Sequence, residues 1–387
     1  MRVAIDYTTG IWPGAGVARY TAQLVAALAE ADAANQYLLL YGGSRDLPHD
    51  TEQWVAAQRL FAAHPNFQPR PIPGPLRLAL RWQRFAPRLL PAEAFTGRVD
   101  IFHAPDFVAP ATRARLIITV HDLSFLVMPE CAEEGLRRYL TATLPRSAKR
   151  ADLILADSEA TRRDIITHLG IAEARVRVVY GGVDARFRPI ALDEAERITL
   201  LQRVGLPDAP FVLAVSRLEP RKNFVRLIEA FTHLLTAGYP HNLAISGRKG
   251  WLYEPIFEAA EWVNAQYGQR VFFLDHVSDA DLPALYSACA AFAYPSLYEG
   301  FGLPPLEAMA CAAPALVANV SSLPEVVGDA ALLVSPTDSE AITDGLRRIL
   351  DDEELAAKLR QRGPQQAAKF TWAAAAQGVL RAYQEVI

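Results

Sequence analysis

The sequence predicts an α/β protein built from two doubly wound domains, each with a mostly parallel sheet between helices. Short runs of β-branched and other apolar residues alternate with longer segments in which apolar residues recur every three or four positions. This alternation is typical of parallel strands joined by right-handed helical crossovers. The strand candidates outnumber the roughly ten strands that one strongly twisted open sheet carries. We therefore expect two sheets, and hence two domains.

The strand candidates form two groups, one in each half of the chain. The first group is 2–6, 37–41, 100–103, 116–120, 153–156 and 176–179, and the second is 211–216, 243–246, 271–274, 291–294, 315–318 and 331–334. Of the helical patterns between them, 224–235 follows Asn223, which we expect to be its N-cap. Turn-forming sequence over 181–210 separates the groups, and we place the domain boundary after residue 190.

Composition and charge exclude several classes of protein. The chain carries 39 Lys and Arg against 43 Asp and Glu, a net charge of −4, whereas nucleic-acid-binding domains usually carry a basic excess. Cys131, Cys289 and Cys311 are too far apart for a zinc knuckle or a redox pair, and a sparse, odd set suits a reducing cytoplasm. The first residues follow a strand pattern instead of a signal peptide, and no run of about 18 apolar residues predicts a membrane span. We therefore expect a cytoplasmic protein without a nucleic-acid partner.

The loop 217–223, RLEPRKN, follows a predicted strand and leads into a predicted helix. Ligands of open parallel sheets bind beyond the carboxyl ends of the strands. Arg217 and Lys222 lie five residues apart on this loop, so a guanidinium and an ammonium group can share one diphosphate. The alternative is an ordinary solvated, charged loop.

The loop 299–307, EGFGLPPLE, follows another predicted strand. Gly300 and Gly302 allow a ligand to approach the backbone, and the prolines after them suit the first turn of a helix, whose free N–H groups attract anions. Glu299 and Glu307 stand at the two ends of this segment, and both carboxylates can face one ligand. Otherwise Glu307 only complements the helix dipole and Glu299 lies on the surface.

Three further features are weaker. Ser278 and Asp281 are spaced as a helix cap, and we prefer that interpretation of Asp279-Ala-Asp281 to a metal-binding one. In the first half, Gly16 lies in GAGVARY between a strand and a helix, without the spacing of a dinucleotide-binding loop. His121 ends a predicted strand and precedes an acid, which makes it a functional candidate as well as a structural one.

Five segments carry a resemblance to a known family. They are GAGVARY, VHDLSF, VVYGGVD, AVSRLEPRKN and YEGFGLPPLEAMACAAP, the last with two glutamates separated by seven residues. In this order they resemble glycosyltransferase family 4, the retaining transferases of GT-B fold. The resemblance implies two Rossmann-like domains facing each other across a cleft: an acceptor-side domain at 1–190, and a nucleotide-sugar-binding domain at 191–369. The last helix, 370–387, would pack back on the first domain.

The resemblance also implies how the donor is held. Arg217 and Lys222 would bind its diphosphate, together with backbone amides of the loop before the helix. Those amides belong to Gly300, Phe301, Gly302 and Leu303.

The remaining implied contacts come from both domains. Glu307 would bind the ribose hydroxyls, Glu299 would contact the transferred sugar, and the base would lie against the backbone near Val277. From the first domain, His121 would lie beside the sugar and Gly16 would approach the phosphates. The chain departs from the family where alanine precedes Gly16, since the family often has two glycines there.

The implied reaction is transfer of a hexose from a nucleotide-diphosphate sugar to a glycan or lipid-linked acceptor, with retention and without a metal or other cofactor. The SGRKGW segment at 246–251 is similar to mannosyltransferases of surface-polysaccharide pathways, which favours GDP-mannose. UDP-glucose, UDP-N-acetylglucosamine and a GT-B epimerase stay open as alternatives. The residues leave two mechanisms open, a covalent intermediate on Glu299 and same-face attack within an ion pair.

Residues 76–90, LRLALRWQRFAPRLL, suggest contact with a membrane. Arg77, Arg81, Arg84 and Arg88 share one face of a predicted helix beside an apolar face. Such a helix can bind anionic lipid, and it would place the protein peripherally at the inner membrane face. The alternative is an ordinary amphipathic helix packed on the first domain, and Pro87 interrupts the pattern.

Overall fold

The computed structural model describes residues 1–387 except 13, 15, 44–46, 48–49, 75–90 and 276, so the predicted membrane-binding helix lies outside the described residues. The chain divides into two compact units. Unit 1 comprises Met1–Gly182 and Thr371–Ile387, and unit 2 comprises Val183–Phe370. Among the described residues, every helix is too short or too polar to cross a lipid bilayer.

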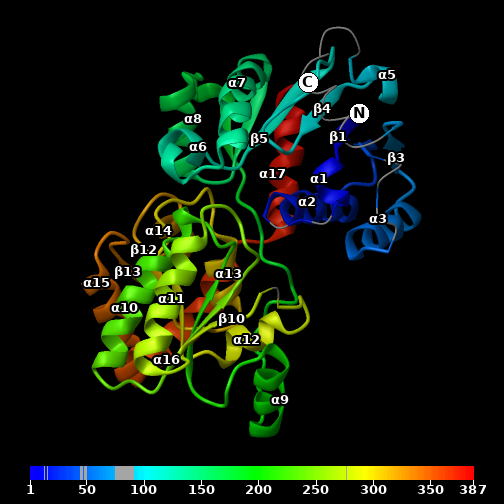
Figure 1. Cartoon of the computed structure of the whole chain (residues 1–387). Helices are drawn as coiled ribbons and strands as arrows, with labels where there is room; N and C mark the ends of the chain where they lie inside the picture. Colours follow the sequence, from blue (N-terminus) through cyan, green and yellow to red (C-terminus); the bar gives the residue numbers. More distant parts are fainter. Residues whose placement is uncertain (13, 15, 44–46, 48–49, 75–90, 276) are drawn as a thin grey trace. The chain divides into compact units, whose positions relative to one another are not determined.

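Unit 1 is built on a seven-stranded parallel sheet with the order β3-β2-β1-β4-β5-β6-β7 (Figure 1). Its strands are β1 (Arg2–Asp6), β2 (Gln36–Tyr41), β3 (Phe67–Pro71), β4 (Ile101–Ala104), β5 (Arg115–Val120), β6 (Leu153–Ala156) and β7 (Val176–Val178). The α-helices described in it are α1 (Thr8–Ile11), α2 (Val17–Ala31), α3 (Glu52–Ala63), α5 (Glu93–Thr96), α6 (Ser124–Val127), α7 (Glu134–Arg150), α8 (Glu159–Leu169) and α17 (Trp372–Glu385).

The strand β3 is absent from the sequence prediction. Pro69 and Pro71 lie within it and break the strand pattern. A proline donates no backbone hydrogen bond, so it is tolerated where one side of the strand has no partner. Accordingly, β3 is the edge strand of the sheet and pairs with β2.

Unit 2 is built on a six-stranded parallel sheet with the order β10-β9-β8-β11-β12-β13. Its strands are β8 (Phe211–Val215), β9 (Asn242–Ser246), β10 (Val271–Phe273), β11 (Ala291–Tyr294), β12 (Ala315–Ala318) and β13 (Leu332–Val334). The α-helices described in it are α9 (Glu194–Val204), α10 (Phe224–Thr236), α11 (Glu254–Tyr267), α12 (Leu282–Ala288), α13 (Leu303–Ala310), α14 (Leu323–Val327), α15 (Ser339–Asp351) and α16 (Glu353–Ala367).

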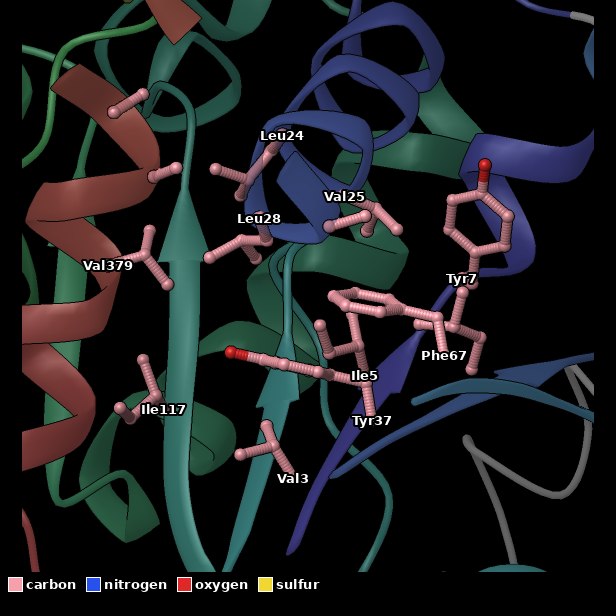
Figure 2. Close-up of a cluster of buried hydrophobic side chains, with 14 of the residues drawn as sticks. Val3, Ile5, Tyr7, Leu24, Val25, Leu28, Tyr37, Phe67, Ile117 and Val379 are labelled. Carbon is pink, nitrogen blue, oxygen red and sulfur yellow. The ribbon is translucent and has the colours of Figure 1, made fainter. Parts of the chain in front are cut away.

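The last helix, α17, belongs to the core of unit 1. Val379 and Tyr383 share a buried cluster with Leu24 and Leu28 of α2, and Figure 2 shows Val379 beside these two leucines. The ring of Tyr37 stacks on Phe67 in the same cluster, with ring centroids 4.1 Å apart. Burying an aliphatic side chain such as that of Val379 contributes about 1.5–3 kcal/mol to stability. The helix is therefore a structural part of unit 1, although it follows unit 2 in the chain.

Asn223 precedes α10 as predicted, but its side chain does not cap the helix. Its backbone is left-handed, with φ of 62°, and no side-chain capping bond forms. The amide instead donates to the carbonyls of Pro295 (2.9 Å) and Pro336 (2.7 Å), which follow β11 and β13. Asparagine tolerates left-handed φ better than most residues, which suits it to this position. Through its two hydrogen bonds, Asn223 joins three loops at one edge of the sheet.

Candidate active site

The direction of the chain numbering reverses between β8 and β11, which are neighbours in the unit 2 sheet. The carboxyl edge at such a switch point is where open α/β sheets bind ligands. The loop after β8 ends in a 3₁₀ turn, Pro220–Lys222, and the loop after β11 leads to α13. The Leu297 N–H donates to the Arg221 carbonyl over 2.8 Å and joins the two loops directly.

Glu299 is the centre of a buried ionic cluster. Its Oε1 accepts from Lys222 Nζ (2.6 Å) and from the Tyr294 hydroxyl (2.9 Å), and its Oε2 accepts from Arg221 Nη1 (3.0 Å). The side chain is 8 % exposed. Burial raises the pKa of Glu299, but the charges of Lys222 and Arg221 outweigh burial and lower it to about 2. The carboxylate is therefore ionised at neutral pH.

Lys222 is buried with Glu299 instead of standing on a solvated loop. Burial and the neighbouring Arg221 charge lower its pKa, against the opposing effect of Glu299. Its Nζ also donates to the Tyr294 hydroxyl (3.2 Å). Burial and the Glu299 charge raise the pKa of that hydroxyl well above its ordinary value, so Tyr294 stays a neutral hydrogen-bonding group.

Arg217, the other predicted diphosphate ligand, has a different environment. It is exposed, and its guanidinium lies 5.7 Å from the ring centroid of Trp251. Backbone bonds join its loop to the SGRKGW segment, from Leu218 N–H to the Arg248 carbonyl (3.0 Å) and from Gly250 N–H to the Leu218 carbonyl (2.9 Å). The structure thus places one predicted cation in solvent and the other inside an ion pair.

The loop before α13 is tightly held. The Glu299 N–H donates to Ser321 Oγ (2.8 Å), and the buried Ser322 hydroxyl bonds to the carbonyls of Glu299 (3.0 Å) and Phe301 (2.8 Å). Gly302, with φ of 113°, precedes the first helical residue, Leu303. A β-carbon at Gly302 would meet Leu323 Cδ2 at 2.8 Å, so the turn requires glycine.

The start of α13 offers fewer N–H donors than an ordinary helix. Pro304 and Pro305 are its second and third residues, and proline has no N–H. Of the first three residues of α13, Leu303 alone therefore carries a backbone N–H. The predicted anion site depends on the loop more than on the helix.

Glu307 is the fifth residue of α13 and lies in its second turn, because the helix begins at Leu303. It is 4 % exposed, and its Oε2 accepts from the hydroxyl of Tyr286 in α12 (3.3 Å). Val277, which follows β10, is buried at the same edge of the sheet. Nearby, the Gly247 N–H donates to the Asp275 carbonyl (2.7 Å), so the loops after β9 and β10 are also connected.

The two acids considered as metal ligands are paired with arginines of unit 2. Asp279 Oδ2 lies 2.8 Å from Arg186 Nη1, and Asp281 Oδ1 lies 2.9 Å from Arg203 Nη2. The Asp281 N–H donates to Ser278 Oγ (3.1 Å), but α12 begins at Leu282 with Asp281 as its N-cap residue and without a side-chain capping bond. The predicted cap at Ser278 is therefore wrong, and both acids precede the helix. Each acid has a basic partner within unit 2.

His121, in unit 1, has both ring nitrogens bonded within that unit. Nδ1 lies 2.7 Å from Asp157 Oδ2, and Nε2 lies 2.8 Å from the Pro105 carbonyl oxygen. Because a carbonyl only accepts, Nε2 carries a proton. Burial lowers the pKa of His121, but the charge of Asp157 and the hydrogen bond to it outweigh burial and raise the pKa to about 9. This histidine is held as a buried cation and not as a free base.

Gly16, also in unit 1, is the residue before α2 and has φ of 54°. A β-carbon at Gly16 would have no atom within 4 Å. Glycine is therefore favoured by the positive φ of the backbone and not by a lack of space. The other sequence-predicted residues, Arg217, Lys222, Val277, Glu299, Gly300, Phe301, Gly302, Leu303 and Glu307, all belong to unit 2.

Sequence reasoning missed three members of the Glu299 cluster. Arg221 and Glu219 lie in the same loop as Lys222, and their opposite charges, two residues apart, were the available signal. Tyr294 is the last residue of a predicted strand, and nothing in the sequence distinguished its hydroxyl from those of other strand tyrosines.

Solved structures with the same architecture show the fold of the protein. A sucrose-phosphate synthase from Thermosynechococcus elongatus matches with a TM-score of 0.75 and 21 % identity over 100 % of this chain and 98 % of that one. Anabaena Alr3699/HepE, in complex with UDP and glucose, matches with a TM-score of 0.70 and 20 % identity over the whole of both chains. The two parallel sheets and these likenesses define a GT-B fold.

The chain belongs to glycosyltransferase family 4. The model of that family matches residues 14–187, and the model of glycosyl transferases group 1 matches residues 197–366. O-antigen chain mannosyltransferase B of Escherichia coli is 32 % identical over 379 residues, which cover 96 % of this chain and 97 % of that protein. The protein is therefore a glycosyltransferase.

Proposed function

We propose that this glycosyltransferase moves mannose from GDP-mannose to a glycan or lipid-linked acceptor, with retention of configuration and without a divalent metal. The observation that carries the proposal is the charge arrangement at the β8–β11 switch point. It comprises exposed Arg217, the buried Lys222–Glu299 pair (2.6 Å), and the amides of the loop before α13. Cations and backbone donors are what a departing nucleoside diphosphate requires.

The leaving group gains negative charge as the bond to the sugar breaks. Groups fixed in advance around that charge stabilise the transition state most effectively. In this proposal Arg217 and Lys222 bind the diphosphate, Gly302 lets it approach the loop backbone, and Glu307 accepts hydrogen bonds from the ribose. Val277 lies beside the base. The roles that the family resemblance implies for Gly16 and His121 of unit 1 stay predictions.

The environment of Glu299 supports same-face attack over a covalent intermediate. Three donors, from Lys222, Tyr294 and Arg221, bond to its two oxygens, and the pKa near 2 makes it a weak nucleophile. Its charge can still stabilise the oxocarbenium character of the sugar. In this mechanism the acceptor hydroxyl attacks the face that the diphosphate leaves, and the departing phosphate takes the hydroxyl proton.

GDP-mannose is proposed as the donor on two grounds. The relative from Escherichia coli that matches nearly the whole chain is named a mannosyltransferase. In addition, the SGRKGW segment is hydrogen-bonded to the loop that carries Arg217, which puts it beside the proposed diphosphate site. The same relative's name, which refers to an O-antigen chain, supports a glycan as acceptor.

A donor panel tests the proposal. The purified protein is mixed with GDP-mannose, UDP-glucose or UDP-N-acetylglucosamine, and release of nucleoside diphosphate is measured with and without methyl α-mannoside or a mannose oligosaccharide. We expect acceptor-stimulated GDP release and an α-linked product by NMR. GDP at 100 times its Kd should stabilise the fold by about 2.7 kcal/mol in thermal unfolding.

A UDP-sugar donor is the second candidate, because Alr3699/HepE, which shares the fold, was solved with UDP and glucose. Faster release of UDP than of GDP in the panel would replace GDP-mannose by that candidate. Release of nucleoside diphosphate that no acceptor stimulates, together with a changed free sugar, would indicate a GT-B epimerase instead.

A further inference from the structure

Arg221 makes a set of contacts that the proposed donor site does not use. Its Nη1 donates to the Tyr298 carbonyl (2.8 Å) and to Glu299 Oε2 (3.0 Å), and its Nη2 donates to Glu219 Oε1 (2.8 Å). The side chain is 14 % exposed. The guanidinium therefore faces protein groups and bridges two carboxylates from different loops.

The bridge orders four charges in a row. Glu219, Arg221, Glu299 and Lys222 alternate in sign, and each is bonded to the next. Lys222 stands at one end of this row, and an ammonium group has three N–H donors. Among the residues that the structure describes, two of these donors bond to Glu299 and Tyr294, which leaves the third for a further acceptor.

Arginine is suited to the bridging position in a way that lysine is not. Its planar fork holds two acceptors at a fixed angle, whereas an ammonium group is a single point of charge. Arg221 can therefore hold the Glu299 carboxylate in place and balance its negative charge. The ammonium group of Lys222 can then bind another anion as well. Without the fork, Glu299 and Glu219 would be two buried carboxylates near a single ammonium, which would draw Lys222 inward.

We propose that Arg221 is a positioning residue for transfer: it fixes Glu299 between the two loops and so directs the Lys222 ammonium toward the donor diphosphate, without contacting the donor itself. This inference rests on the proposed function of Lys222 as a diphosphate ligand. Glu219 is part of the same arrangement, because its carboxylate balances the charge of Arg221 and fixes the orientation of the guanidinium group.

Four variants test the role. Arg221→Met removes the fork, Arg221→Lys keeps its charge, Glu219→Gln removes the balancing acid, and Arg221→Met with Glu219→Gln removes both. Arg270→Met is the matched control: its Nη1 also donates to a carbonyl, that of Pro240 (2.9 Å), but the residue precedes β10, at the opposite edge of the sheet. Donor KM, kcat, the pH profile and thermal unfolding with and without GDP are measured for each.

We expect Arg221→Met to lower kcat/KM for the donor about 100-fold, mostly through KM, and to move the acid limb of the profile to higher pH. That limb reports Glu299, whose pKa is lowered by the charges of Lys222 and Arg221 against the effect of burial. Arg221→Lys should keep the acid limb and recover about tenfold in kcat/KM. The double variant should be more active than Arg221→Met, because one buried carboxylate fewer competes for Lys222.

The outcomes separate this inference from the proposed function. A wild-type protein that releases no nucleoside diphosphate from any donor would reject the proposed function. An active wild type whose Arg221→Met variant keeps its KM and acid limb would reject the positioning role alone. An equal loss in Arg221→Met and the double variant, with lower unfolding temperatures and no change in pH profile, would reduce Arg221 to a structural brace and also overturn the inference.

Discussion

Lys222 Nζ lies 2.6 Å from Glu299 Oε1, although 77 residues separate them in the chain, and both side chains are buried. Arg217, on the same loop as Lys222, is exposed and lies over the ring of Trp251. The two cations lie close together in the sequence but have different environments: Lys222 forms a buried ion pair, and Arg217 is exposed. Arg217 can change without disturbing the interior, whereas the loss of Lys222 removes a partner from a buried carboxylate.

Substitution should separate these two roles. We expect Arg217→Met and Lys222→Met each to lower activity 100-fold or more, since in the proposed mechanism each removes a group that stabilises the developing anion. Only Lys222→Met should also lower the free energy of unfolding, by about 3–5 kcal/mol, because it breaks a buried ion pair. Urea unfolding beside kinetics checks this. Equal stability of the two variants would contradict the assignment of Lys222 to the interior.

The pair of His121 and Asp157 should make unit 1 sensitive to alkaline pH. The pKa of His121 in the folded chain, about 9, lies above its ordinary 6.5, so the stabilisation is complete below about pH 6.5 and is lost as the pH rises through 9. Asp157→Asn should remove about 3–5 kcal/mol at pH 6 and flatten this dependence. Urea unfolding at pH 6, 7.5 and 9 measures both effects.

The exposed pair of Glu134 and Arg138 provides the control, and Glu134→Gln should leave the pH dependence unchanged. If Asp157→Asn kept the wild-type loss of stability between pH 6.5 and 9, His121 would not be its source.

Gly247 should tolerate no side chain. Its φ is 154°, and a β-carbon would lie 1.7 Å from the carbonyl oxygen of Ser216. We expect Gly247→Ala to destabilise the protein by more than the roughly 1–3 kcal/mol of backbone strain alone, because the loops after β8 and β9 must separate. Gly205→Ala is the matched variant: its φ is 80°, but no atom lies within 4 Å of the added carbon. Equal unfolding temperatures for the two variants would refute the steric argument.

Activity should not depend on a divalent metal. The reasons are the cations that we propose as diphosphate ligands and the pairing of Asp279 with Arg186 (2.8 Å) and of Asp281 with Arg203 (2.9 Å). We expect saturating EDTA to leave the initial rate within about twofold and Asp279→Asn to have a similarly small effect. Loss of activity in EDTA that manganese or magnesium restores would reverse this expectation and make both acids candidate ligands again.

Helix α17 should contribute to stability through one polar contact as well as through its apolar face. The Tyr383 hydroxyl lies 2.8 Å from His103 Nδ1, and both residues are fully buried. Burial lowers the pKa of His103 to about 3, so the imidazole is neutral. Tyr383→Phe should cost about 1–3 kcal/mol in urea unfolding, because it leaves a buried ring nitrogen without this partner. Exposed Gln384 offers a control on the same helix, and Gln384→Ala should have little effect.

Much of the architecture follows from local pattern, and the exceptions have physical causes. Strand β11 has the bounds that alternation predicts, Ala291–Tyr294, because a strand buried on both faces is apolar at each position. Strand β3 was missed because an edge strand is stabilised by pairing with β2 in spite of its prolines. Pairing across the chain overrode the local sequence there.

The candidate site was predictable to the level of loops but not of contacts. Parallel strands bring their carboxyl ends to one edge, so the segments with Lys222 and Glu299 were expected to converge. The spacing of residues does not determine which cation is buried, since burial depends on how each loop turns. For the same reason, His121 was expected near the sugar, whereas its bonds to Asp157 and Pro105 are set by three strands whose register no local pattern specifies.

The position of α17 in the chain has a consequence for biosynthesis. The helix that covers Leu24 and Leu28 is translated after all of Val183–Phe370, so the ribosome completes unit 2 before it completes unit 1. Domains generally fold as units in the order of their synthesis. Here unit 1 emerges first but completes its folding last. Its α2 face stays uncovered by α17 while unit 2 is translated and folds. The nascent chain therefore offers an apolar surface to chaperones for as long as it takes to translate unit 2.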